Sequence, residues 1–228
     1  MIFINRQEAG RELASRLTKY ANRPDVIVLG VPRGGVAVAF EVATTLQLPL
    51  DVFVLRKLGV PGHEELAFGA IGSGGVRVLN SNVVEELGIS AQDISRVTRA
   101  ERYELERREL LFRGDRPPLD VYERIVILVD DGIATGASVR AAIAALRQME
   151  PAAIVIATPV APLGTCDLLQ AEVDELVCLE TPEPFYGVGQ FYQDFTQVSD
   201  EEVTDFLDLA FRQRDSQRVR STAASSRR

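Results

Sequence analysis

The stretch R-I-V-I-L-V-D-D-G-I-A-T-G-A-S, residues 124–138, decides the fold of this chain. Its first part, Ile125–Val129, is aliphatic at every position and too short for a helix, as expected of a parallel strand that is buried on both faces. Asp130 and Asp131 follow directly. Two adjacent carboxylates at the carboxyl edge of a buried strand repel each other and lose solvation, so they predict a bound cation or a ligand that donates hydroxyl groups.

The residues after the two aspartates predict an anion site. Thr135, Gly136 and Ser138 are small or carry hydroxyl groups, and the Ala-rich run 141–148 has helix-forming character. Residues 135–138 are therefore expected at a helix N-terminus, where backbone N–H groups, hydroxyls and the positive end of the helix dipole favour a phosphate. A ribose 5-phosphate, with a vicinal diol close to its phosphate, would fit both features.

The residues Val126–Ser138 resemble the 5-phosphoribosyl-1-pyrophosphate (PRPP) motif of type I phosphoribosyltransferases. The resemblance implies that Asp130 and Asp131 hold the ribose 2- and 3-hydroxyls. It assigns the 5-phosphate to one loop, formed by Ala134, Thr135, Gly136, Ala137 and Ser138. An ordinary strand-turn-helix with a capping threonine or serine is the alternative, since D-D-G alone is a common turn.

A second candidate loop is G-V-P-R-G-G, Gly30–Gly35, between the predicted strand Val26–Leu29 and a predicted helix. Glycines around one arginine let the backbone approach a polyanion while the guanidinium makes forked contacts. The spacing is not that of the dinucleotide motif G-x-G-x-x-G. In a phosphoribosyltransferase this loop would bind pyrophosphate through Arg33, Gly34 and Gly35. The alternative is a glycine-rich turn with a solvated arginine.

The third candidate is R-K-L-G-V-P-G-H-E-E-L, residues 56–66, after the predicted strand Leu50–Leu55. Adjacent Arg56 and Lys57, followed by glycines and proline, predict a basic patch beside a flexible lid. The arrangement is similar to adenine and xanthine phosphoribosyltransferases, where this loop closes over PRPP, and the resemblance assigns both cations to pyrophosphate. Solvated surface cations are the alternative, and His63 is expected to be solvated or close to the substrate.

Length and composition limit the fold, the cellular compartment and the kinds of site that the chain can have. At 228 residues and 46% hydrophobic content, the chain suits one α/β domain with additions. No apolar run approaches the ~20 residues that span a bilayer and no secretory signal is evident, so no membrane partner is expected and the cytoplasm is the predicted compartment. Cys166 and Cys178 are isolated, which argues against a zinc site or a disulfide framework. His63 is the only histidine, so a Ser-His-Asp triad would have to include it.

The net charge of −8 is unevenly distributed. Residues 212–228 hold six arginines and one aspartate, a net +5, so residues 1–211 carry −13. An acidic body argues against a nucleic-acid partner. Residues 212–228 have little to bury and are predicted to be disordered, and the domain is expected to comprise residues 1–211.

The other segments predict additions to the sheet. Residues 68–80 are expected to form a hairpin at an antiparallel edge of the sheet, and residues 80–118 a helical insertion. A solvated helix is the first interpretation of this insertion, and an arm that packs on a second copy, giving a homodimer, is the second. The aromatic segment 181–198 is predicted to form a hood that packs on the core or stacks on a planar base. A helix over 200–211 ends the domain.

The three candidate loops follow strands whose carboxyl ends meet at the ligand-binding edge of open α/β sheets. With P-R-G-G, R-K-L-G-V-P and V-D-D-G-I-A-T-G in this order, the chain resembles a bacterial group of predicted phosphoribosyltransferases. The resemblance implies their fold, a mainly parallel sheet flanked by helices, and transfer of ribose 5-phosphate from PRPP to a nitrogenous, nucleobase-like acceptor. Catalysis would involve Asp130, Asp131, Arg33 and Lys57. Mg²⁺ would be held by PRPP itself, with the two aspartates as the protein groups able to join it.

Two other functions fit the same residues. A non-catalytic PRPP-sensing regulatory or partner-binding protein would keep the pocket and lack an acceptor site. An unrelated nucleotide-binding α/β protein would prefer a nicotinamide or adenine nucleotide to PRPP. The resemblance leaves the acceptor open, but Ala134 stands where hypoxanthine and guanine enzymes carry an aspartate that exchanges a proton with the purine. Because a methyl group cannot act as an acid or base, 6-oxopurines are predicted to be poor acceptors.

Overall fold

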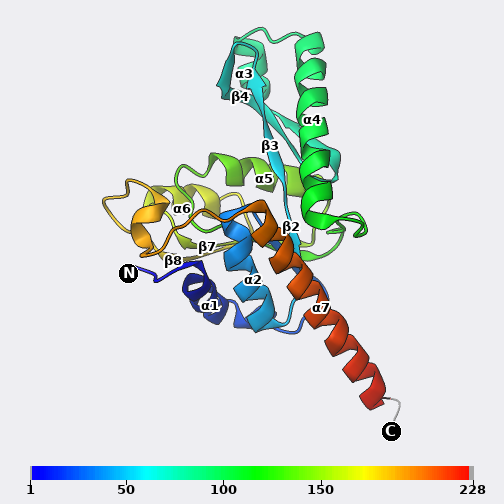
Figure 1. Cartoon of the computed structure of the whole chain (residues 1–228). Coiled ribbons are helices and arrows are strands. Elements are labelled where there is room, and N and C mark those ends of the chain that lie inside the picture. Colours follow the sequence, from blue (N-terminus) through cyan, green and yellow to red (C-terminus); the bar gives the residue numbers. More distant parts are fainter. Residues whose placement is uncertain (1, 226–228) are drawn as a thin grey trace.

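The computed structural model describes residues 2–225 of the chain, with side chains up to residue 214. A body with a five-stranded parallel sheet carries an arm that projects from it, and one long helix leaves the body in another direction (Figure 1). Among the described residues, none of the helices combines the length and the apolar character that crossing a bilayer requires.

The parallel sheet has the strand order β2-β1-β6-β7-β8. Its strands are β1 (Val26–Gly30), β2 (Leu50–Val52), β6 (Ile125–Val129), β7 (Ala153–Val160) and β8 (Glu175–Glu180). The central strands are buried along almost their whole length, as their aliphatic sequences predict. Gly30 pairs with Val129, and Val129 with Ala157, so the three central strands are in register at their carboxyl edge.

Helices cover both faces of this sheet. They are α1 (Arg6–Arg16), α2 (Gly34–Leu46), α5 (Ala137–Arg147) and α6 (Leu163–Gln170). Because strand side chains alternate, Val26 and Val28 pack with α1 and α2, whereas Ile27 and Leu29 pack with α5 and α6. Asn5 caps α1, since its side chain accepts a hydrogen bond from the backbone N–H of Glu8. The mainly parallel α/β fold predicted from the sequence is therefore confirmed.

The arm comprises β3 (Leu55–Val60), β4 (His63–Gly72), β5 (Val76–Leu79), α3 (Ser81–Glu86) and α4 (Ala91–Arg113). The flexible loop predicted over 56–66 is wrong. Leu58 and Val60 are buried in β3, and Pro61 and Gly62, with φ +81° at the glycine, form the tight turn into β4. The hairpin predicted over 68–80 is confirmed as β4 and β5, but it belongs to a separate antiparallel sheet, β3-β4-β5, and adds no edge to the parallel sheet.

The chain returns through a short 3₁₀ helix, η3 (Val188–Phe191), to the long helix α7 (Asp200–Ser225). Ser199 caps α7: its hydroxyl accepts from the Glu202 N–H, and the Glu202 carboxylate accepts from the Ser199 N–H. The helix predicted to end at Phe211 continues to Ser225, through residues where disorder was expected. The reason is local, because residues 200–225 contain no glycine or proline and include several arginines and alanines, which favour helix. Residues 226–228, predicted to be disordered, lie outside the described residues.

Candidate active site

The loops after β1 and β6 touch at the carboxyl edge of the sheet, as the sequence predicts. A Cβ atom added to Gly35 would lie 2.7 Å from the carbonyl oxygen of Val129 and 2.9 Å from Cα of Asp130. One added to Gly34 would lie 1.9 Å from Oδ2 of Asp131. Only glycine fits at either position, so the P-R-G-G loop packs directly against the two aspartates.

Asp131 has a cationic partner that the sequence did not reveal. The Nε atom of Arg6 donates to Asp131 Oδ2 at 2.7 Å, and its Nη1 atom donates to the Thr196 carbonyl at 2.8 Å. The guanidinium also lies 4.0 Å from the ring centre of Phe195, and Arg6 is only 8% exposed. The Tyr192 hydroxyl donates to the Asp131 carbonyl at 2.6 Å. The start of α1 and the segment after η3 thus hold Asp131 from two sides.

The repulsion between the two carboxylates affects the pKa of Asp130. Its Oδ1 atom accepts from the backbone N–H of Asp131 at 2.9 Å. Burial and the neighbouring charge of Asp131 raise the pKa of Asp130 well above its ordinary value, and the Arg6 guanidinium opposes this only in part. A cation or a hydroxyl donor beside Asp130 would relieve the repulsion, so the pair fits both Mg²⁺ and a ribose diol.

A metal at this pair would need further ligands. In the described part of the chain, no group of three or more His, Cys, Asp or Glu side chains is placed to hold a metal ion. A Mg²⁺ ion at the two carboxylates would therefore need its remaining ligands from oxygen atoms of a bound molecule, of water or of neutral groups of the chain.

The predicted phosphate loop is an open helix N-terminus. Helix α5 begins at Ala137, and its N-cap is Gly136, which has φ +74° and no side chain to occupy the N–H groups of the first turn. The loop residues around it are exposed to solvent: Ala134, Thr135, Ala137 and Ser138. Behind the loop, the Thr165 hydroxyl of α6 donates to the Ala134 carbonyl at 2.8 Å. The loop is thus fixed from behind and open in front, which suits an anion.

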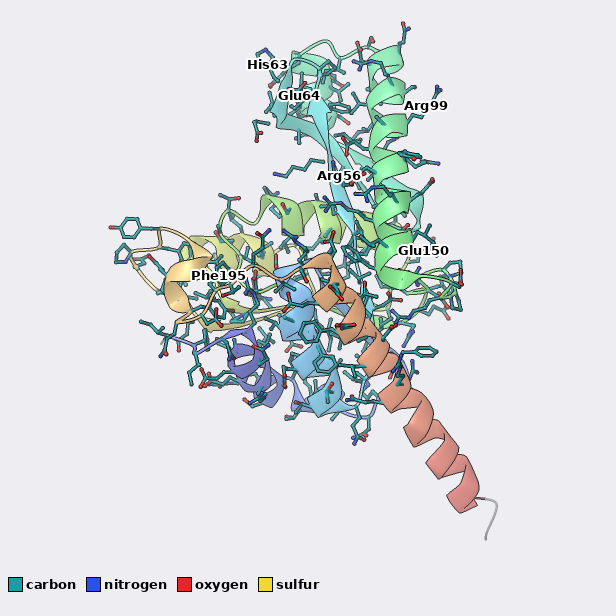
Figure 2. The ribbon with its side chains drawn as sticks, in the orientation of Figure 1. Arg56, His63, Glu64, Arg99, Glu150 and Phe195 are labelled. Carbon is teal, nitrogen blue, oxygen red and sulfur yellow. The ribbon has the colours of Figure 1, made fainter. Side chains whose placement is uncertain are left out.

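A pocket of about 540 Å³ lies between the edge of the parallel sheet and two elements of the arm, β3 and α4. Its lining includes Pro32 after β1, Arg56 and Lys57 in β3, and Ser138 at the start of α5. Figure 2 shows Arg56 between β3 and α4, where its Nε atom donates to Glu101 Oε2 at 2.7 Å. Lys57 is exposed and has no ion-pair partner among the residues that the structure describes. The two predicted cations therefore share one pocket with residues of both other loops.

The comparison with known proteins agrees with this geometry. A family model described as the phosphoribosyl transferase domain matches residues 4–196. The chain belongs to the phosphoribosyltransferase family. It is 50% identical, over 211 residues and 92% of its length, to "Putative phosphoribosyl transferase Rv0571c" of Mycobacterium tuberculosis strain H37Rv, and it spans 47% of that relative. The crystal structure of TT1426 from Thermus thermophilus superposes with a TM-score of 0.80 at 41% identity, covering 91% of this chain and 98% of that one.

Most of the residues highlighted from the sequence do not line this pocket: Arg33, Gly34, Gly35, His63, Asp130, Asp131 and residues 134–137. The Arg33 guanidinium lies 3.8 Å from Oδ1 of Asp200 at the start of α7, and Arg33 does not line the pocket. His63 lies at the exposed tip of the arm (Figure 2). The residues that sequence reasoning missed are Arg6 and, on α4, Glu101, which orders Arg56. No local pattern marks either, since their partners are distant in the sequence.

Proposed function

We propose that the protein is an Mg²⁺-dependent phosphoribosyltransferase that transfers ribose 5-phosphate from PRPP to a nitrogenous, nucleobase-like acceptor and releases pyrophosphate. The observation that carries the proposal is the direct packing of Gly34 and Gly35 against Asp131 and Asp130, beside the open N-terminus of α5. A diol site, a glycine-rich loop for a polyanion and a phosphate site then occupy one sheet edge, in the combination that PRPP requires.

Each part of the donor has a group to receive it. Asp130 and Asp131 accept hydrogen bonds from the ribose 2- and 3-hydroxyls, and the first turn of α5, with the Ser138 hydroxyl, binds the 5-phosphate. The diphosphate lies toward Arg33, Arg56 and Lys57 and the backbone of residues 34–35. Mg²⁺, when bound with PRPP near the two aspartates, would neutralise charge on the diphosphate.

The reaction then exchanges one bond at the anomeric carbon. The bond from this carbon to the diphosphate oxygen breaks, and the electron pair leaves with pyrophosphate. A nitrogen lone pair of the acceptor forms the new bond, and the proton that the acceptor loses passes to solvent. The carboxylates of Asp130 and Asp131 stabilise the positive charge that develops on the ribose, while Lys57 and Arg56 stabilise the departing diphosphate.

The test is the variant Asp130→Asn/Asp131→Asn, measured by calorimetric titration with PRPP and Mg²⁺. Hydrogen bonds to charged groups contribute about 1.5–3 kcal/mol each, so the double variant should bind PRPP at least tenfold more weakly. Asp167→Asn, which changes an exposed aspartate of α6, is the matched control and should bind like the wild type. Unchanged affinity for PRPP in the double variant would show that the two aspartates do not bind the donor.

A non-catalytic PRPP sensor is the second candidate, and the aromatic segment favours it. Tyr192 is buried and lies against Phe195 with ring centres 5.1 Å apart, and Phe191 is buried too. These rings pack on the core and are not available to stack on an acceptor base, and the most exposed ring of the segment, Tyr186 at 85%, faces solvent. A pyrophosphate-release screen over nucleobases and small amines separates the two functions, because a sensor binds PRPP with Mg²⁺ and releases no pyrophosphate with any acceptor.

A further inference from the structure

The pocket beside the donor site has a wall that the family motifs do not describe. Helix α4 of the arm contributes residues at helical spacing to this wall, among them Arg96, Glu101 and Arg108. Arg96 and Arg108 are twelve positions apart, or about 18 Å along the helix axis, so they mark opposite ends of the pocket.

Arg108 stands at the end of the pocket nearest the body. The carboxyl end of α4 is fastened to the parallel sheet, because Arg113 makes a two-pronged ion pair with Asp51 of β2, at 2.9 and 3.0 Å, and Phe112 is buried in the core. Arg108 is little more than one turn before this anchor and shares the pocket with Pro32 of the loop after β1. Its side chain therefore lines the pocket together with a residue of the glycine-rich loop.

The charge of the pocket suits a polyanion. The chain as a whole has 33 acidic and 25 basic side chains, yet the pocket lining holds four cations, Arg56, Lys57, Arg96 and Arg108, against two acids, Glu64 and Glu101. Excess positive charge in a concave site of an acidic protein attracts and retains an anion.

The hydrogen-bonding groups of Arg108 are mostly unused. Its Nε atom donates to Oε1 of Glu104 at 3.1 Å, but that carboxylate already receives two shorter bonds, of 2.8 and 2.9 Å, from the neighbouring Arg107. A guanidinium carries five N–H donors in a planar fork that matches phosphate oxygens. Arg108, half-buried in the pocket lining, can therefore present its terminal N–H groups to a ligand.

We propose that Arg108 of α4 is a further donor-binding residue, which contacts the diphosphate of PRPP from the side opposite the glycine-rich loop. This inference rests on the proposed function. It gives the helical insertion a role in the site: α4 is a fixed wall that supplies one cation directly, through Arg108, and orders a second, Arg56, whose Nε atom donates to Glu101 at 2.7 Å.

The experiment compares Arg108→Gln with Arg107→Gln. Both arginines pair with Glu104 from the same helix, but only Arg108 lines the pocket. Calorimetric titrations use PRPP with Mg²⁺, pyrophosphate with Mg²⁺, and ribose 5-phosphate. We expect Arg108→Gln to weaken PRPP and pyrophosphate about tenfold or more and to leave ribose 5-phosphate unchanged, with partial recovery in Arg108→Lys and no change in Arg107→Gln.

The outcomes separate this inference from the proposed function. A wild-type protein that binds neither PRPP nor pyrophosphate would overturn both. A wild-type protein that binds PRPP, with Arg107→Gln and Arg108→Gln of equal affinity, would overturn only the role of Arg108. An equal loss of ribose 5-phosphate and pyrophosphate in Arg108→Gln, with a lowered thermal midpoint, would mean that Arg108 acts through folding, which also contradicts the inference.

Discussion

Replacing Arg6 by methionine isolates the role of the buried ion pair at the candidate site. The side chains of Arg6 and Asp131 are 10% and 15% exposed, so the variant leaves a buried carboxylate without its cation. It also removes the bond to the Thr196 carbonyl and the contact with the Phe195 ring. Removing one partner of a buried pair costs about 3–5 kcal/mol. For a domain of this size, that loss corresponds to a thermal midpoint roughly 6–20 °C lower.

Arg11→Met is the matched control, because Arg11 lies on the same helix and pairs with Glu41 at 3.1 Å, but its side chain is 65% exposed. An exposed pair contributes at most about 1 kcal/mol. Urea denaturation and thermal scanning of both variants give the comparison, and PRPP titration reports whether Asp131 keeps its orientation. Arg6→Lys, which keeps the charge and loses the planar fork, should lie between wild type and Arg6→Met. Equal losses in Arg6→Met and Arg11→Met would refute the reasoning.

Four further outcomes test the site. Gly34→Ala forces a methyl group onto the carboxylate behind it and should weaken PRPP strongly, whereas Gly164→Ala, with nothing within 4 Å of the new methyl, should bind normally in the same titration. Lys57→Ala and Arg33→Ala should weaken the binding of pyrophosphate and leave the binding of ribose 5-phosphate unchanged. Equal losses of affinity for both ligands would show that these cations do not face the diphosphate. Steady-state assays should give hypoxanthine and guanine a lower kcat/KM than the best other acceptor, and the reverse would point to a proton-transfer group outside the phosphate loop. Because burial and a neighbouring charge raise the pKa of Asp130, the folded ligand-free protein retains a proton that the unfolded chain releases above about pH 4, so stability falls as pH rises toward the raised pKa. Urea denaturation between pH 5 and pH 8 should show this slope in the wild type and a smaller one in Asp130→Asn.

The body of the fold could be predicted because its signals are local. The run Ile125–Val129 forms β6 with the predicted ends, and Val26–Leu29 lies within β1. Parallel strands place their carboxyl ends at one edge, which predicted one edge for the loops after β1 and β6, and the pairing of β1 with β6 in the sheet makes these loops neighbours. The contact between Gly34 and Asp131 follows from that topology together with the small size of glycine.

The arm could not be predicted in the same way, because glycine and proline occur both in flexible loops and in the tight turns of hairpins. In residues 56–66 they suggest a mobile loop, but Pro61 and Gly62 form only the turn, while the buried Leu58 and Val60 make β3 one side of a hairpin. Burial of these side chains depends on α4, which packs beside β3 and lies some forty residues later in the sequence. The tendency of glycine and proline to form loops was therefore outweighed by packing between β3 and α4, which a short stretch of sequence cannot reveal.

Arg6 shows the same limit at the level of one side chain. An arginine in the first turn of a helix is ordinarily solvated, and the dipole of the helix gives it no support there. What buries Arg6 is a set of partners from two distant segments: the carboxylate of Asp131 at the sheet edge, and the carbonyl of Thr196 and the ring of Phe195 after η3. Each partner comes near only when the sheet edge and the segment after η3 are assembled.

The electrostatics of the site indicate which groups are fixed before a ligand arrives. Asp131 is neutralised by Arg6, and Arg56 is ordered by Glu101, so one carboxylate and one cation are already held in place. Asp130 and Lys57 lack such a partner among the described residues, and burial together with the neighbouring charge of Asp131 raises the pKa of Asp130. Under the proposed function, a ligand with hydroxyls at one end and phosphates at the other would pair with both groups, so its binding would relieve repulsion at Asp130 and give Lys57 a partner at the same time. The folded state therefore gains stability as this ligand saturates the site. The size of this gain depends on the unpartnered Asp130 and Lys57, rather than on Asp131 and Arg56, which already have partners.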